Sequence, residues 1–259
     1  MNIRKYLKFV YLGIRLVKFH KSSYIAYLVS TILWIIIVVC PALVLSPNPI
    51  KTLYTYFPGI LTFNIVSSGV WTSVDYFRFY YYQGLTDLFI ECGVGILEYS
   101  IICILTDGLL IPLISFITIF SIATMYVKIS IMYIVPKSLT MFIIGLICSL
   151  PLFLLGSTLT GIILVLSPVE VAWISLFEFI FLIGTVIPPQ FTSGTLSFII
   201  PTTLAADLLR AAYSSNYLPI DLLYLLSPIY FITISTISIL MGKYCDKVVK
   251  RRGIPIRRG

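Results

Sequence analysis

Three carboxylates lie in a stretch of tyrosines and glycines that interrupts a very apolar chain. Residues 79–105, FYYYQGLTDLFIECGVGILEYSIICIL, contain Asp87, Glu91 and Glu98. Hydrolytic or metal chemistry needs more groups than these, and the sequence has one histidine, His20, and no HExxH or GxSxG motif. It also lacks GxxxxGK[ST], the loop that binds nucleotide phosphates. We therefore expect a protein that is not an enzyme and that binds no cofactor or metal, with any ATP chemistry in a partner.

Two further acids lie inside apolar runs, Asp107 in CILTDGLLIP and Glu178 in SLFEFIFL. A carboxylate in lipid is costly, so such residues usually face a pathway or a partner. Asp107 precedes Pro112 by five residues, where a kinked helix can offer it freed backbone N–H groups. Both acids are candidates for a translocation path. Structural pairing inside a helical bundle is the alternative for each.

The composition predicts the elements that hold these residues. With 59% hydrophobic residues, 11% charged residues and a mean hydropathy of +1.04, the chain has the composition of an integral membrane protein. A crossing helix needs about 20 mainly apolar residues. Continuous rather than alternating apolar runs predict an all-α polytopic membrane protein with six transmembrane helices. The runs are 24–45, 59–76, 99–120, 139–166, 171–187 and 222–241.

Basic residues are concentrated at the two ends of the chain. Six of the 18 precede the first run and seven follow the last. The positive-inside rule therefore predicts that both termini are cytoplasmic, which an even number of crossings satisfies, in the cell (plasma) membrane. The net charge of +8 indicates attraction to anionic lipid headgroups in the bilayer and no nucleic-acid partner.

The chain is predicted to form a single transmembrane domain, 1–259, with basic segments at both ends. Residues 1–22 place basic side chains on one arc of a helix and apolar ones opposite, which predicts an amphipathic helix on the inner membrane surface. A basic flank that only fixes orientation is the alternative. Residues 243–259 are predicted to be a basic cytoplasmic tail.

Residues 77–98 form the predicted connection between the second and third crossings, on the cytoplasmic side. Acids mixed with Leu85, Leu88 and Phe89 predict a short amphipathic helix, followed by a turn at 92–95 and the start of the third crossing. Such a helix can dock in a groove of a cytoplasmic subunit. Alternatively, it shields the inner face of the bundle.

The external segments are predicted to be short apart from one. Residues 46–59, SPNPIKTLYTYFPG, are an outside loop, and 124–138 form an external surface segment. The stretch from Ile187 to Asp221 is too polar and too rich in proline to cross, so we expect short re-entrant or external helices there, including 201–213. Asp207 and Arg210 are three residues apart on that helix and can pair with each other.

Three segments in this order resemble the membrane subunit (permease) of type-2 ATP-binding-cassette (ABC) exporters. They are FPGILTFNIVSSGVW (57–71), QGLTDLFIECGVGILEYSI (83–101), and FLIGTVIPPQF (181–191) with PTTLAADLLRAAY (201–213). Residues that fall in the order of the family's pattern are Pro58, Gly59, Gly84, Asp87, Glu98, Gly184, Pro188, Pro201, Asp207 and Arg210. The chain departs from that pattern at 80–82, where tyrosines replace an acid, at Gly93, where proline is usual, and at Ile96, where a basic residue is usual.

The resemblance implies an assembly of two membrane subunits and two cytoplasmic ABC ATPase subunits, which bind ATP and Mg. The second membrane subunit is another copy of this chain or a related permease. On this hypothesis Gly84, Asp87, Glu91 and Glu98 transmit the ATPase motion, while Pro188, Asp207 and Arg210 belong to an external gate. Lipids, drug-like molecules, peptides and glycans remain open as substrates. An ion-coupled carrier using Asp107 and Glu178, and a membrane scaffold or assembly protein without a path, are the alternative functions.

Overall fold

The structure, a computed structural model, describes residues 7–8, 11, 21–79, 84–105, 110–125, 131–166, 170–186, 200–211 and 216–252. Every regular element within these ranges is a helix, which confirms the predicted all-α class. In chain order the helices are α2 (Lys21–Val44), α3 (Pro49–Val74), the π-helix η1 (Asp75–Phe79), α5 (Leu85–Glu91), α6 (Ile96–Leu105), α7 (Leu110–Met125), α8 (Ile131–Leu166), α9 (Glu170–Val186), α11 (Pro201–Ala211) and α12 (Ile220–Arg252).

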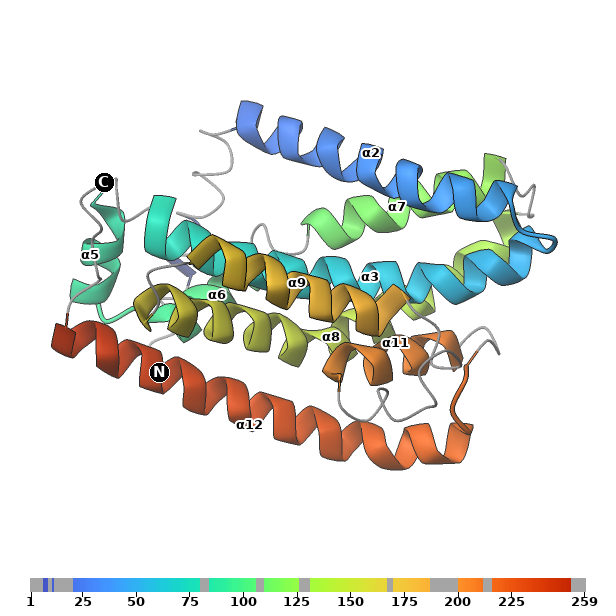
Figure 1. Ribbon diagram of the computed structural model, residues 1–259. Helices are drawn as coiled ribbons and strands as arrows, with labels where there is room; N and C mark the ends of the chain where they lie inside the picture. The colour runs from blue at the N-terminus through green and yellow to red at the C-terminus, as the bar shows by residue number, and fades with distance from the viewer. Residues whose placement is uncertain are drawn as a thin grey trace.

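The long helices run side by side along one common direction (Figure 1). Helix α3 lies in the middle and contacts α2, α7, α8, α9 and α11. Helix α12 runs the length of the bundle and packs against α8, α11 and α6. The short helices α5 and α11 lie at opposite ends of the bundle, next to opposite ends of α12 (Figure 1).

Helix α3 begins earlier than the sequence predicts. Asn48 caps it by accepting a hydrogen bond from the backbone N–H of Lys51 at 3.2 Å, and Pro49 occupies the first helical turn, where its missing N–H costs nothing. The predicted outside loop 46–59 is therefore mostly helix. Pro58 and Gly59, expected at the start of the second crossing, lie inside α3.

Small residues bring α3 and α8 close together. A Cβ atom built on Gly69 of α3 would lie 2.2 Å from the carbonyl oxygen of Phe153, so this position accepts no side chain. The hydroxyl of Ser73 donates to the carbonyl of Ser157 at 2.5 Å, and Ser100 of α6 is hydrogen-bonded to the Ser157 hydroxyl. Close approach at small residues with hydroxyl hydrogen bonds is typical of helix packing in membranes.

The helices overlap all six predicted apolar runs, but they extend beyond several of them. Within the described ranges one helix, 220–251, is both long and apolar enough to cross a bilayer by length and composition. Shorter apolar helices cover Leu28–Val44, Leu150–Leu166 and Ala172–Ile183. The third run is covered by α6 and α7, with 106–109 between them outside the described residues.

The predicted terminal and external segments are described only in part. Most of the predicted amphipathic helix 1–22 lies outside the described residues. Residues 243–252 of the predicted basic tail continue α12 as a helix, and the last seven residues lie outside the described ranges. Helix α8 begins at Ile131, inside the predicted external segment 124–138, and it continues through Pro136 and Lys137 into the fourth apolar run.

Candidate functional site

Residues 84–98, which we call the bend, lead from η1 into the first turn of α6. They contain one short helix between two glycines. Helix α5 follows Gly84 (φ 71°) and ends at a turn in which Gly93 (φ 70°) is left-handed. The N–H of Gly93 donates to the carbonyl of Ile90 at 2.9 Å, and that of Val94 to the carbonyl of Phe89 at 2.8 Å. This pair of bonds is a Schellman motif, whose left-handed position favours glycine. Gly93, which departs from the family's usual proline, is therefore required by the turn.

Helix α5 has an inward face and an outward face. Thr86 and Phe89 are buried against the bundle. Asp87 and Glu91 are exposed, and the Leu88 side chain between them keeps 52% of its surface exposed. The outward face thus presents an apolar residue flanked by two carboxylates.

The inward face of α5 is fixed to the end of α3 and η1. The Thr86 hydroxyl donates to the carbonyl of Tyr76 at 2.5 Å, and the Tyr76 hydroxyl donates to the carbonyl of Val94 at 2.9 Å. Tyr76, Phe77, Phe89 and Tyr99 form an aromatic cluster with ring centroids 4.8 to 6.2 Å apart. A displacement of α5 therefore acts directly on the end of α3.

The far side of the bend is fixed to α12. A carboxylate oxygen of Asp246 accepts a hydrogen bond from the backbone N–H of Ile96, the first residue of α6, at 2.8 Å. A Cβ atom on Gly95 would lie 2.1 Å from the other oxygen of this carboxylate. Asp246 thus caps α6 from another helix and occupies the space of a side chain at position 95. Glu98 lies half-buried in the first turn of α6.

At the opposite end of the bundle, Arg210 of α11 is fully buried. Its Nε donates to the carbonyl of Thr55 in α3 at 2.9 Å, and its Nη2 donates to the carbonyl of Thr185 in α9 at 2.6 Å. Thr185 lies in the last turn of α9, where unpaired carbonyls favour a cation. A Cβ atom on Gly59 would lie 2.1 Å from that carbonyl oxygen, so only glycine allows α9 to end there.

Asp207 of α11 is also fully buried and fixes the start of α12. Its carboxylate accepts hydrogen bonds from the backbone N–H groups of Tyr217 at 2.9 Å and Leu218 at 2.8 Å, just before α12 begins. The carboxylate lies 3.8 Å from the Arg210 Nη1, and the Arg210 Cζ lies 5.4 Å from the centre of the Tyr217 ring. We call Thr55, Thr185, Asp207, Arg210 and Tyr217 the outer cluster.

Burial disfavours the charged forms of both ionisable residues in the outer cluster that form an ion pair, Asp207 and Arg210. It raises the pKa of the Asp207 carboxyl, while the two backbone N–H groups and Arg210 oppose this shift. Burial also lowers the pKa of the Arg210 guanidinium, while Asp207 opposes the shift. Each charge is tolerated in the interior because the other charge and several backbone groups compensate it. The predicted pairing of Asp207 with Arg210 is therefore present, and it is part of a larger set of contacts that joins α3, α9, α11 and α12.

The remaining residues that the sequence singles out lie on α9 or outside the described residues. Glu178 lies half-buried on α9 and accepts a hydrogen bond from the Ser67 hydroxyl of α3 at 2.7 Å. Gly184 lies in α9, near its end. Asp107 and Pro188 lie outside the described residues. Within the described ranges, no three His, Cys, Asp or Glu side chains come close enough to hold a metal ion.

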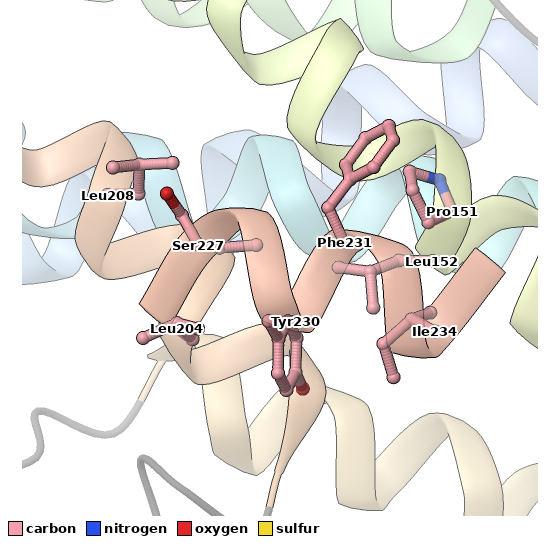
Figure 2. Close-up of a pocket in the computed structure, with 9 residues that line it drawn as sticks. Pro151, Leu152, Leu204, Leu208, Ser227, Tyr230, Phe231 and Ile234 are labelled. Carbon is pink, nitrogen blue, oxygen red and sulfur yellow. The ribbon is translucent and has the colours of Figure 1, made fainter. Parts of the chain in front are cut away.

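A cavity of about 30 Å³ lies between α8, α11 and α12. Figure 2 shows its lining, which is apolar apart from the hydroxyls of Ser227 and Tyr230. Small-molecule sites usually measure at least about 300 Å³. This cavity is too small to hold a substrate. We therefore assign no substrate-binding role to the residues that line it.

Several residues of these two groups are not singled out by the sequence analysis. They are Thr55, Tyr76, Thr86, Gly95, Thr185, Tyr217 and Asp246. Asp246 carries a visible signal, because it is the only acid among the basic residues after position 241. The others act through backbone groups, through packing or, at Tyr76 and Thr86, through a hydroxyl bonded to a backbone carbonyl, and none of these leaves a signature in a single sequence.

Comparison with known proteins finds no match: no protein family, no curated protein and no solved structure resembles this chain at a significant level.

Proposed function

We propose that this chain is the transmembrane subunit of an ATP-driven exporter, in which two copies, or this chain and a related permease, enclose a substrate path. Two cytoplasmic ABC ATPase subunits bind ATP and Mg and drive the transport. The observation that carries the proposal is the bend, where an exposed surface on α5 is fixed through its inward face to the ends of α3 and α12. A force applied to that surface reaches long helices on both sides.

The outer surface of the bundle supports placement in a membrane. Large apolar side chains are exposed along α2, α9 and α12, among them Ile37 at 70%, Phe179 at 57% and Ile232 at 65%. Soluble monomers rarely expose apolar patches of this extent. We infer six crossings in the plasma membrane, formed by α2, α3, α6 with α7, α8, α9 and α12, with both termini in the cytoplasm.

The two groups of fixed residues suit opposite ends of an alternating-access path. The helices of the two groups, α5 and α11, lie at opposite ends of the bundle (Figure 1). On our proposal the bend faces the cytoplasm and the outer cluster faces the outside. The outer cluster joins four helices through buried charges, so it forms a stable closed contact at that end. The exporter function requires that ATPase-driven displacement of the bend open this contact.

The experiment first asks whether a gene next to the one for this chain encodes a P-loop ATPase, and then co-expresses the two proteins. We expect the two proteins to co-purify when they are co-expressed and the chain to alter the rate of ATP hydrolysis in vesicles. Replacing both exposed acids of α5, Asp87→Lys and Glu91→Lys, should weaken the association about tenfold or more, because the two substitutions reverse the charge of the proposed docking surface.

A matched control reverses one exposed acid at the other end of the bundle. Asp221 lies at the start of α12 and is exposed, so Asp221→Lys should leave the association unchanged. Equal association for all variants would remove the docking role of α5. Proton-driven transport by the purified chain without any ATPase would replace the exporter with the ion-coupled carrier.

A further inference from the structure

We propose that α12 links the bend to the outer cluster as a rigid connecting rod, with Asp246 as the positioning residue at one end and Asp207 at the other. The two carboxylates make the same kind of contact. Asp246 accepts from the backbone N–H of Ile96, at the start of α6. Asp207 accepts from the backbone N–H groups of Tyr217 and Leu218, directly before α12.

The two contacts are far apart and are joined by one unbroken helix. Helix α12 has 33 residues, so it is about 50 Å long at 1.5 Å per residue. Figure 1 shows its two ends beside α5 and α11 respectively. Helix α3, continued by η1, also contacts both short helices, but it lies in the middle of the bundle, whereas α12 lies along its edge.

Between its two ends, α12 is held by one narrow face. Leu223, Ile234 and Ser238 are buried on this face, while Leu225, Ile232 and Leu240 expose about two thirds of their surfaces. The Ser238 hydroxyl lies 3.5 Å from the carbonyl of Pro151, which is a weak hydrogen bond. The contacts in the middle are thus mainly apolar and non-directional. Apart from the weak bond of Ser238, the hydrogen bonds that join the described part of this helix to its neighbours lie at its ends.

The bend is fixed to α12 more tightly than a single hydrogen bond requires. The Asp246 carboxylate fills the space beside Gly95, and Cys245 and Val249 on the same helix are buried against the bundle. Movement of residues 94–96 therefore either carries the end of α12 with it or breaks the contact with Asp246.

A hinge in α12 is the competing arrangement. Pro228 lies inside the helix, and a proline can allow a helix to bend there. If α12 bends at Pro228, its two ends move independently. If α12 moves as one body, release of one end favours release of the other end. This effect has the same size in both directions.

Amide hydrogen exchange of the isolated chain in lipid nanodiscs distinguishes the two arrangements. The amides of Ile96, Tyr217 and Leu218 each donate to one of the two carboxylates, so their exchange rates report the two contacts separately. In Asp246→Ala exchange at Ile96 becomes about tenfold faster in either arrangement, because its acceptor is lost. The rod predicts that exchange at Tyr217 and Leu218 becomes faster as well, by about fivefold or more. Amides in the middle of α8 should keep the wild-type rate.

Reciprocity and matched variants complete the test. Asp207→Ala should accelerate exchange at Ile96 by the same factor by which Asp246→Ala accelerates exchange at Tyr217 and Leu218. Asp246→Asn keeps an acceptor for the Ile96 N–H, so its exchange rates should lie between those of the wild type and Asp246→Ala. This variant also tests the proposal if Asp246→Ala folds poorly. Lys247→Gln changes the adjacent exposed residue and should alter neither contact. Acceleration at Ile96 alone in both Asp246 variants would overturn the rod in favour of a hinge.

The transport role of this link rests on the proposed function, but the exchange experiment needs no ATPase. A chain that shows the linked exchange and binds no ATPase would retain the rod and lose the exporter. A chain that binds and stimulates an ATPase but shows exchange changes only near the substituted residue would retain the exporter and lose the rod.

Discussion

Gly95 and Asp246 compete for one space, and this competition predicts the stability of three variants. A Cβ atom on Gly95 would lie 2.1 to 2.4 Å from all three terminal atoms of the Asp246 side chain. Gly95→Ala must therefore displace the carboxylate and break its bond to the Ile96 N–H, which belongs to a fully buried residue. Gly95 has no left-handed backbone, so alanine introduces no strain of its own.

The magnitudes follow from the lost hydrogen bond. Asp246→Ala leaves the buried Ile96 N–H without its charged acceptor, which costs about 2 kcal/mol. Gly95→Ala costs a similar amount, reduced by about 0.5–1 kcal/mol because alanine lowers the entropy of the unfolded chain. In the double variant the alanine Cβ lies in the space that the carboxylate has left. We therefore expect the double variant to be about as stable as Asp246→Ala alone, a coupling of about 1–2 kcal/mol between the two positions.

Reversible unfolding of the four proteins in mixed detergent micelles measures this coupling. The combination of Gly95→Ala with Lys247→Gln is the control, because Lys247 is exposed and its effect should add to that of Gly95. The loss of unfolding free energy in Gly95→Ala/Asp246→Ala could instead equal the sum of the two single losses to within about 0.5 kcal/mol. That result would show that the two residues do not compete for one space, and the assigned contact of Gly95 with Asp246 would be wrong.

Two further substitutions test the outer cluster and the packing of the bundle. Arg210→Lys should lower the free energy of unfolding by about 2 kcal/mol or more. The Arg210 guanidinium donates from two nitrogens to the carbonyls of Thr55 and Thr185, and a single ammonium group cannot reproduce this geometry. An unchanged unfolding midpoint would contradict the assigned contacts. Gly69→Ala should lower the free energy of unfolding by about 1–3 kcal/mol, because its Cβ would meet the Phe153 carbonyl oxygen at 2.2 Å, whereas Gly84→Ala, with no atom within 4 Å, should cost only the roughly 1 kcal/mol of its left-handed backbone.

The sequence predicts the helical class and the bend because both depend on local patterns. Continuous apolar runs can satisfy their backbone groups in lipid only as regular structure, and the structure has helices over all of them. The amphipathic segment at 85–91 and the glycine that ends it are also local, and α5 and its turn lie where the pattern places them. The start of α3 is missed because Pro49 and Pro58 indicate a loop, although the Asn48 cap and the position of Pro49 in the first turn are compatible with a helix.

The contacts that join the helices are not predictable from one sequence because their partners are distant in the chain. Arg210 binds a carbonyl 155 residues away, and Asp246 binds an amide 150 residues away. Any residue type supplies the same carbonyl or amide, so Thr55, Thr185 and Ile96 carry no mark of these roles. The spacing of Asp207 and Arg210 predicts their mutual pairing, but it does not show that each is bound to other helices as well.

These distant contacts also decide how the ends of the bundle can affect each other. Local patterns place an exposed surface on α5 and a pair of charges on α11, and each alone has an ordinary structural explanation. Asp246 and Asp207 change this interpretation, since Asp246 joins one end of α12 to the start of α6 and Asp207 joins the other end to α11. Helix α12 can transmit a force only if it resists bending at Pro228, which lies nearer the outer cluster than the bend. The linked exchange of Ile96 with Tyr217 and Leu218 therefore tests the one property on which communication through α12 depends.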